Sequence, residues 1–227
     1  MSLFAIADTH LSFGTDKPMD AFPGWNDYTR RLEENWRKLV GADDTVVIAG
    51  DISWAMDFET LKADFEFLNS LPGKKLIVKG NHDYWWTTMT KMNKFVQENG
   101  FTTISFLHNN SYEYGSVSLC ASRGWFFDSP EEQDEKVLMR EVGRIRASLN
   151  AAVSGEKIVF LHYPPVTSNG ICAEIVDLLK EYGIKKCYYG HLHGAAARYA
   201  FEGECSGIDF RLISADRLSF VPLLIIK

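Results

Sequence analysis

The sequence repeats one pattern along its length: a short apolar run that ends in aspartate, asparagine or histidine side chains. In residues 76–83 the run Leu-Ile-Val-Lys is followed by Gly80, Asn81, His82 and Asp83. The same arrangement, with other polar side chains, occurs at residues 6–10, 46–51, 158–162 and 187–193. In open parallel sheets, ligands bind at the carboxyl ends of the strands. The pattern therefore predicts a parallel sheet whose polar residues gather at one edge.

Apolar periodicity in the first half of the chain predicts alternating strands and helices. Strands are expected at residues 3–7, 45–49 and 75–79. Helices are expected to begin at residue 26 or 27, at 57 and at 84, and to end at residues 41, 72 and 98. This β-α-β-α-β order implies right-handed crossovers and helices on the faces of the sheet. Residues 11–25 hold two glycines and two prolines and are expected to form a long loop, and loops of this length are often functional.

The second half of the chain is expected to add further strands and helices. Residues 101–107 and 116–121 have strand character with a polar turn at 109–111, so they are expected to form a strand pair. The expected order continues with a loop and helix start at residues 128–135, whose helix runs on to residue 149. A strand at 157–161, a helix at 172–182 and a strand at 185–189 are expected to follow. The tail is expected to form antiparallel strands of a second sheet at residues 198–202, 208–214 and 219–225. We expect one domain over residues 1–227.

Charge and composition argue against several classes of protein. The net charge of −6, with no cluster of Lys and Arg, argues against a general nucleic-acid-binding surface. The longest apolar run, residues 220–226, is too short to cross a bilayer, and the first residues do not have the pattern of a signal peptide, so we expect a cytoplasmic protein. The cysteines are far apart and are expected to be reduced, buried thiols: Cys120, Cys172, Cys187 and Cys205. The sequence leaves the oligomeric state open.

The polar residues that follow the apolar runs are typical of metal ligands. Side chains two apart on an extended segment point to the same side, so Asp8 with His10, and His191 with His193, are each expected to hold one ion. Imidazoles mixed with oxygen ligands suit Zn, Fe, Mn or Ni, and two ions about 4 Å apart are used for in-line phosphoryl displacement. Asp51 is the candidate bridging ligand, because Gly50 permits a sharp turn beside it. The candidate ligands are Asp8, His10, Asp51, Asn81, His162, His191 and His193.

This set of residues resembles the calcineurin-like metallophosphoesterases, whose pattern runs D-x-H, G-D, G-N-H-[DE], H and G-H-x-H. The chain carries these motifs in order between residues 8 and 193: Asp8-Thr9-His10, Gly50-Asp51, Gly80-Asn81-His82-Asp83, His162 and Gly190-His191-Leu192-His193. The resemblance implies that Asp8, His10 and His193 bind one ion and that Asn81, His162 and His191 bind the other, with Asp51 as the bridge. It also implies an α/β fold in which two mixed sheets pack as a sandwich between helices, in four layers.

The resemblance further implies phosphoester hydrolysis by direct attack of a metal-bridging hydroxide, with a small phosphorylated substrate. His82 is expected to donate a proton to the leaving alkoxide or a hydrogen bond to a developing oxyanion, and Asp83 to orient the loop or His82. Protein Ser/Thr phosphatases of this superfamily continue the G-D motif with further Asp and Arg, whereas this chain has Ile52, Ser53 and Trp54. A phosphodiester, nucleotide or other small phosphoester is therefore favoured over a phosphoprotein. A non-catalytic scaffold is the competing class, but no ligand of the motif is lost.

Other chemistry-bearing residues have simpler interpretations. His108 is expected to be an ordinary polar residue. Arg123 is expected to form a surface ion pair, with a phosphate contact as the alternative. Cys205 and Arg211 have the C-x5-R spacing of cysteine phosphatases, but Arg211 enters an expected strand rather than a helix, which argues against that activity. Several aromatic side chains are expected to pack in the core, with the wall of a substrate cleft as the alternative: Trp54, Trp85, Trp86, Trp125, Phe126 and Phe127.

Overall fold

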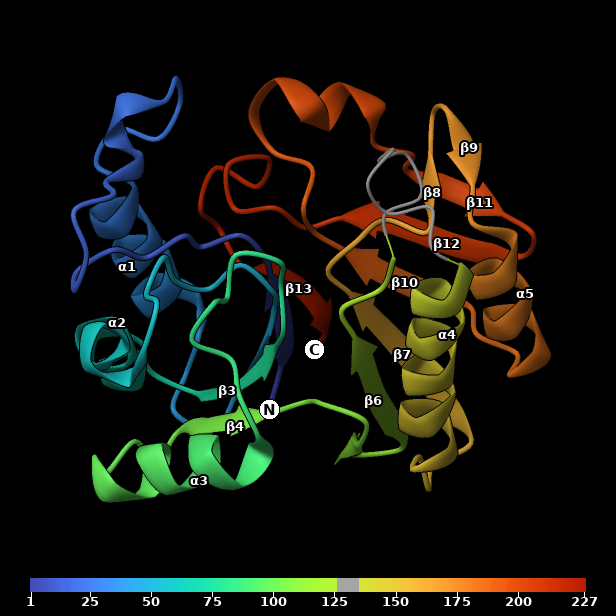
Figure 1. Cartoon of the computed structure of the whole chain (residues 1–227), viewed down its shortest axis with the longest axis horizontal. Coiled ribbons are helices and arrows are strands. Elements are labelled where there is room, and N and C mark those ends of the chain that lie inside the picture. The colour runs from blue at the N-terminus through green and yellow to red at the C-terminus, as the bar shows by residue number, and fades with distance from the viewer. Residues whose placement is uncertain (126–134) are drawn as a thin grey trace.

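The computed structural model describes residues 1–125 and 135–227, which form two mixed sheets lying between two layers of helices (Figure 1). The first sheet has the strand order β13-β1-β2-β3-β4, and the second has the order β11-β12-β10-β7-β6-β5. A short hairpin, β8 (Val166–Thr167) with β9 (Gly170–Ile171), lies outside both. Residues 128–134 of the expected loop and helix start lie outside the described residues, as do the candidates Phe126 and Phe127, and the helix is described from Glu135.

The first sheet contains the β-α-β-α-β order that the sequence predicts. Neighbouring strands from β1 to β4 are parallel, and β13 is antiparallel to β1. The side chain of Asp57 accepts a hydrogen bond from the Thr60 N–H and so caps the second helix, as predicted. The elements are β1 (Leu3–Ile6), α1 (Tyr28–Leu39), β2 (Thr45–Ala49), α2 (Phe58–Ser70), β3 (Lys74–Val78), α3 (Met89–Glu98), β4 (Ile104–Phe106) and β13 (Leu223–Ile226).

The second sheet has a parallel centre and antiparallel edges. Strands β12, β10, β7 and β6 run parallel to one another, and the edge strands β11 and β5 are antiparallel to β12 and β6. Helices α4 and α5 cover its outer face (Figure 1). The elements are β5 (Ser111–Tyr114), β6 (Val117–Ser122), α4 (Glu135–Asn150), β7 (Glu156–Leu161), α5 (Ala173–Glu181), β10 (Lys186–Tyr189), β11 (Gly203–Cys205) and β12 (Ile208–Leu212).

Strand alternation divides the core into separate apolar layers. On β1, Phe4 and Ile6 pack against the helices of the first half, while Leu3 and Ala5 pack toward the second sheet. The layer between the sheets also contains Phe160 from β7, and a further layer joins the second sheet to α4 and α5. Because successive side chains of a strand point to opposite faces, each sheet is buried on both sides. The predicted four-layer sandwich is confirmed.

The third helix begins later than predicted. Residues 84–88 are not helical, and α3 begins at Met89, where the side chain of Thr88 accepts a hydrogen bond from the Lys91 N–H. The indole N–H of Trp85 instead donates to Asp83, and the Trp85 ring is buried. The apolar spacing of residues 84–98 therefore reflects a buried loop followed by a helix.

The predicted strand pair at residues 101–121 is wrong, and the predicted antiparallel tail is only partly observed. Strand β4 belongs to the first sheet, and the antiparallel partner of β6 is β5, which includes part of the predicted turn. In the tail, a 3-10 helix, Gly194–Tyr199, occupies part of the predicted strand at 198–202. Strand β12 is antiparallel to β11, as predicted, but parallel to β10, and β13 returns to the first sheet instead of the second. Apolar alternation indicates a strand but does not specify its partner, which is decided by distant segments.

Among the described residues, each helix is either too short or too polar to span a lipid bilayer. All four cysteines are free, as predicted. Cys120, Cys172 and Cys187 are buried, whereas Cys205 on the edge strand β11 is only half-buried, so the expectation of a buried thiol is wrong there.

Candidate metal centre

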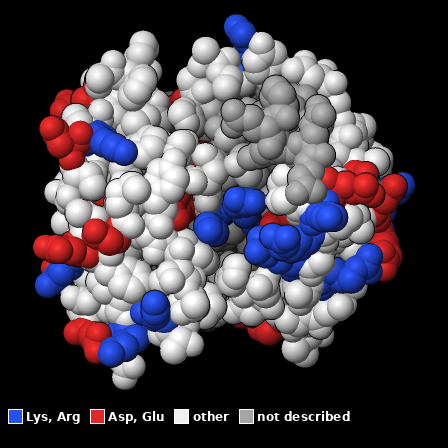
Figure 2. Space-filling view, viewed as in Figure 1, with Lys and Arg blue, Asp and Glu red and all other residues white. Residues whose placement is uncertain are grey.

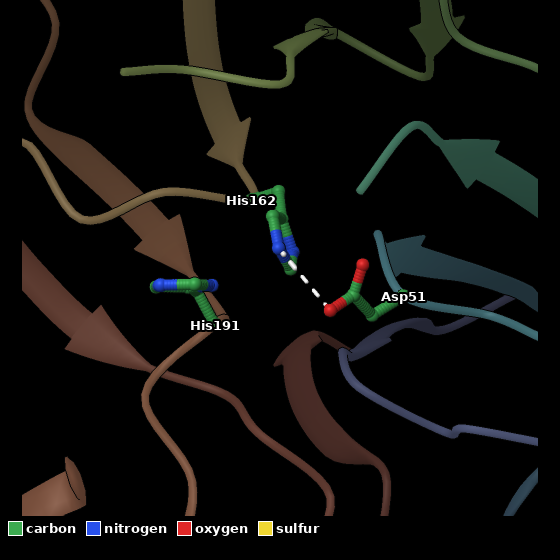
Figure 3. Close-up of side chains that lie close together, drawn as sticks. All are labelled: Asp51, His162 and His191. Atoms are coloured by element: carbon green, nitrogen blue, oxygen red, sulfur yellow. Dashed lines mark ion pairs between the residues drawn. The ribbon is translucent and has the colours of Figure 1, made fainter. Parts of the chain in front are cut away.

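The five polar clusters come together where the two sheets meet. Asp8 and His10 follow β1, Asp51 follows β2, and Asn81 follows β3. From the second sheet, His162 follows β7 directly, and His191 and His193 follow β10. Figure 3 shows Asp51 and His162 directed toward each other, with His191 beside them. The edge predicted from the sequence therefore exists, but both sheets contribute to it.

The backbone is not extended at four of the seven candidate ligands, contrary to the sequence-based expectation. Asp8, His10, Asp51 and His191 have positive φ angles of 56°, 43°, 50° and 71°. Such left-handed conformations cost on the order of 1–3 kcal/mol each and persist where the surroundings over-determine them. Here backbone bonds between loops hold them, since the Asp8 N–H donates to the Gly50 carbonyl and the His10 N–H to the Asp51 carbonyl. Turns and crossed loops, rather than strand alternation, bring these side chains together.

Two motif glycines allow the loops to approach this closely. Gly50 has a φ of +91°, and a Cβ there would lie 2.5 Å from Nδ1 of His162. A Cβ at Gly80 would overlap both Oδ1 and the backbone nitrogen of Asp51. A side chain at either position would therefore displace a candidate ligand.

One set of converging atoms, here called the His10 group, consists of Asp8, His10 and Asp51. All three residues are buried, and their candidate ligand atoms lie within 4.8 Å of one another. Nε2 of His10 lies 3.8 Å from Oδ2 of Asp51. Within the described part of the chain, neither ring nitrogen of His10 nor Oδ2 of Asp51 has a hydrogen-bond partner. Buried polar atoms without partners are costly, so these atoms fit a bound cation.

The second set, here called the Asn81 group, consists of Asp51, Asn81, His162 and His191. Oδ1 of Asn81 lies 2.7 Å from Nε2 of His162 and 3.1 Å from Nδ1 of His191. Nε2 of His162 is also 3.5 Å from Oδ2 of Asp51, the contact drawn in Figure 3. Nδ1 of His162 lies 3.2 Å from the Ala49 carbonyl, which can only accept, so Nε2 of the neutral ring carries a lone pair. Acceptor atoms that face one another in this way fit a cation between them.

Burial keeps these side chains in the form that binds metal. It lowers the pKa of His162 to about 3 and the pKa of His191 to about 2, and it holds the pKa of His10 well below its usual range. The three imidazoles are therefore neutral at pH 7 and have lone pairs available. Burial also raises the pKa of the Asp8 and Asp51 carboxyls, and the nearby charge of Asp51 adds to the effect on Asp8. A bound cation would offset this cost of burying carboxylates.

His82 lies beside these groups without belonging to either. Its backbone N–H donates to Oδ1 of Asp51 at 2.8 Å, which leaves Oδ2 to face the other candidate ligands. Its half-buried ring packs at 4.5 Å from the Trp54 ring, and its Nδ1 is 3.3 Å from the Tyr84 hydroxyl. Burial lowers the pKa of His82, while the charge of Asp51 opposes that effect.

Asp83 joins the two loops that carry Asp51 and Asn81. Its buried carboxylate accepts hydrogen bonds from the backbone N–H groups of Gly80, Asp51 and Ile52 at 2.7, 3.0 and 2.9 Å. It lies in neither ligand group. These contacts hold the two loops together through the Asp83 carboxylate.

His193 and the secondary candidates occupy different surroundings. The His193 ring is half-buried and lies 5.0 Å from the His10 ring, outside the atoms that converge in the His10 group. His108 packs against Trp86 away from both ligand groups. Arg123 forms no ion pair with any residue in the described ranges, so the expected surface pair is not observed there, and its guanidinium lies 5.6 Å from the Tyr163 ring.

The sequence did not single out Trp25, which borders the site. Its ring lies 5.8 Å from both His10 and His193. The available signal was the long turn-rich loop at residues 11–25, which ends at this residue. Of the other aromatic candidates, Trp85 and Trp125 are buried in the core as expected, while Trp54 is half-buried and stacks on His10.

Comparisons with known proteins agree with the geometry. A family model described as calcineurin-like phosphoesterase matches residues 1–195. No curated protein matches the sequence significantly. Among solved structures, the phosphopantetheinyl hydrolase PptH from Mycobacterium tuberculosis is similar in fold, with 16% identity, a TM-score of 0.58, and coverage of 99% of this chain and 95% of that one. A protein of unknown function from Aquifex aeolicus, AQ665, has 16% identity, a TM-score of 0.52, and coverage of 98% and 95%.

Proposed function

Because the chain belongs to the calcineurin-like phosphoesterase family, we propose that it is a two-metal hydrolase of a small phosphoester in which His82 serves the leaving group. One observation carries the proposal. Oδ2 of Asp51 has no hydrogen-bond partner within the described part of the chain and faces imidazole nitrogens from both sides, 3.8 Å from His10 and 3.5 Å from His162. A carboxylate oxygen in that position is suited to serve two ions.

We assign one ion to Asp8, His10, His193 and Asp51, and the other to Asn81, His162, His191 and Asp51. Mixed imidazole and oxygen donors suit Mn, Fe, Zn or Ni. When bound, such ions lower the pKa of water and neutralise charge on a phosphoryl group. The protein contributes neutral imidazoles and a fixed carboxylate, both held by bonds between loops.

His82 is assigned to the leaving group. Hydrolysis adds water to phosphorus and breaks the ester P–O bond, and the alkoxide that leaves needs a proton. The free His82 ring is mainly neutral at pH 7 because burial lowers its pKa. An anionic phosphate beside the ring favours the protonated form, so substrate binding loads the donor. Asp83 acts on the reaction only through the loops that it joins.

The preferred substrate class is a phosphodiester, a nucleotide or another small phosphoester. The residues after Asp51 are Ile52, Ser53 and Trp54 rather than the Asp and Arg that continue this motif in protein phosphatases. Trp54 stacks on His10 and contacts His82, so an aromatic ring borders the proposed position of the leaving group.

The test is hydrolysis of p-nitrophenyl phosphate and bis-p-nitrophenyl phosphate by protein reconstituted separately with Mn, Ni, Fe and Zn. His82→Ala should lower kcat by about 100-fold to 10,000-fold while both metals stay bound. His108→Ala is the matched control, because that histidine packs on Trp86 away from both ligand groups. No turnover with any of the metals, or full activity of His82→Ala, would contradict the proposal. The ratio of the two rates separates a diesterase from a monoesterase.

A further inference from the structure

An apolar cleft opens beside His82 and His193. Its volume is about 590 Å³, and its lining includes Met19, Phe22, Trp25 and Trp54 as well as the two histidines. Sites for small molecules commonly have volumes of about 300–1,000 Å³ and mostly apolar walls. The cleft therefore has the size and character of a site for an organic group.

The inner wall of the cleft is rigid and continuous with the His10 group. The Trp54 ring stacks on His10 with ring centres 4.9 Å apart and planes at 22°. Trp25 is 1% exposed and packs on Tyr28 at 5.5 Å and on Phe220 at 5.1 Å. Neither indole can move without disturbing the core or the His10 side chain.

The outer rim is apolar but open to solvent. Phe22 is 56% exposed, and Pro23 beside it is exposed as well. None of the described residues that line the cleft carries a carboxylate or an ammonium group. Lys17 is close, with its ammonium 5.3 Å from the Trp54 ring, but it is exposed and is not part of the lining. Exposed apolar surface joined to a concave site marks a place where a partner group binds.

The cationic side chains near the site lie away from the cleft, on the side of the Asn81 group. Lys79, Arg123 and Arg144 line a separate small cavity together with Glu141. Figure 2 shows Lys and Arg side chains gathered in the middle of the viewed face, where the two halves of the molecule meet. Arg123 reaches the Asn81 group through Tyr163, whose ring is 4.5 Å from His191. The apolar and cationic surroundings therefore border different ligand groups.

We propose that the cleft holds the alcohol part of the substrate, so that the preferred substrates are phosphoesters of apolar alcohols. This inference rests on the proposed function, because it places the leaving group on the side of His82. With the phosphorus between the two ligand groups, an ester oxygen directed at His82 carries its organic group between Trp25, Trp54 and Phe22. Hydrolysis then releases that alcohol, with its new proton, into the apolar cleft.

The test is a series of n-alkyl phosphates from ethyl to octyl, assayed for phosphate release by the metal-loaded protein. The basicity of the leaving alkoxide is nearly constant along this series, so changes in kcat/KM report burial of the chain. We expect kcat/KM to rise about fourfold for each methylene until the cleft is full. Binding of the matching n-alkylphosphonates, measured by calorimetry, should show the same dependence and does not require turnover.

Phe22→Ala should flatten this dependence for the hexyl and octyl compounds, because Phe22 lines the outer rim of the cleft. Trp54→Ala should flatten it more. Trp86→Ala is the matched control, since this half-buried indole packs on Phe106 outside the cleft and should keep the wild-type dependence.

Chain-length independence in both rate and binding, or a dependence unchanged in Phe22→Ala and Trp54→Ala, would overturn the proposal. If the protein is active but kcat/KM does not change with alkyl chain length, only the cleft assignment is contradicted. Protein that binds longer phosphonates more tightly but hydrolyses no ester supports the cleft and contradicts the hydrolase.

Discussion

The two ligand groups share Asp51 but have different surroundings. The His10 group is fully buried and is bordered by the indole rings of Trp25 and Trp54. The Asn81 group is partly exposed, and the cation of Arg123 lies behind it across the Tyr163 ring. The candidate ligand atoms are also spaced differently in the two groups. Nε2 of His10 lies 3.8 Å from Oδ2 of Asp51, whereas Nε2 of His162 lies 2.7 Å from Oδ1 of Asn81.

Because of this difference, the proposed reaction centre has an apolar side and a cationic side. Apolar walls favour an organic group on the side of the His10 group, while cations favour negative charge on the side of the Asn81 group. A phosphoester likewise has an apolar end and an anionic end. A change at Asp51, which both groups share, should therefore weaken binding of both ions. A change at a residue near only one group should affect that group alone.

The largest effect on both groups together is expected from Asp51→Asn, which changes the shared oxygen. The amide keeps an acceptor for the His82 N–H, but an NH₂ group replaces one carboxylate oxygen. Because the loss of metal chemistry costs several kcal/mol, kcat should fall by about 1,000-fold. Metal content, measured by elemental analysis, should fall for both ions.

The matched control is Asp57→Asn. Asp57 caps α2, and asparagine caps helices about as well as aspartate. Activity and metal content should stay at the wild-type level. Retention of both ions and of most activity by Asp51→Asn would show that the two groups are independent.

A second, smaller effect on both groups is expected from Gly80→Ala. The new Cβ would overlap Asp51, so the shared carboxylate must move. A misplacement of about 1 Å can reduce the rate about 100-fold. Both kcat and the affinity for each ion, measured by calorimetric titration, should fall.

Gly143→Ala is the control, because Gly143 is exposed on α4 and a Cβ there meets nothing within 4 Å. This variant should be as active as the wild type. Loss of only one ion in Gly80→Ala would contradict the shared role of Asp51.

Acidification should weaken the ion of the His10 group more than the ion of the Asn81 group. A raised pKa means that Asp8 takes up protons at a higher pH than an ordinary aspartate, so protons compete early for the His10 group. Lowered pKa values mean that His162 and His191 remain unprotonated at pH 5, so protons compete little at these two ligands. From pH 7.5 to 5.5, the ion of the His10 group should therefore weaken first.

The measurement is Mn²⁺ titration by calorimetry at pH 7.5, 6.5 and 5.5, with Asn81→Ala used to identify which step belongs to which group. If both Mn²⁺ binding steps weaken equally, or if the ion of the Asn81 group is lost first, the proposed difference in pH sensitivity between the two groups is contradicted.

The smallest effect is expected from Arg123→Gln, which should act on one side only. Removing one nearby cation should raise KM about threefold to fivefold, leave kcat unchanged, and lose its effect at high salt. Arg30→Gln is the control, because Arg30 is exposed on α1 and pairs with Glu34. A fall in kcat without a change in KM would argue that Arg123 positions His162 instead of attracting the substrate.

The sequence predicted the layers of the fold but not all of its connections. The alternation of β1, α1, β2, α2 and β3 is local, since each element shows its own periodicity. The strand β5 and the return of β13 to the first sheet were missed. Strand pairing depends on residues far apart in the chain, and no local pattern records it.

The candidate site shows the same division. Asp8, His10, Asp51, Asn81, His162, His191 and His193 could be selected because each follows an apolar run, although their roles as ligands remain a proposal. The left-handed backbone at Asp8 and His10 could not be predicted, because it depends on bonds to the loop that carries Gly50 and Asp51.

The sequence by itself determined which donor atoms the chain possesses and that they follow strands, because residue identity and hydrophobic periodicity are local properties. Only the tertiary structure decided that Oδ2 of Asp51 faces both groups and that Trp25, Trp54, His82 and His193 enclose one cleft. The physical reason is that these relations are distances between separate loops, fixed by the packing of two sheets rather than by any single segment.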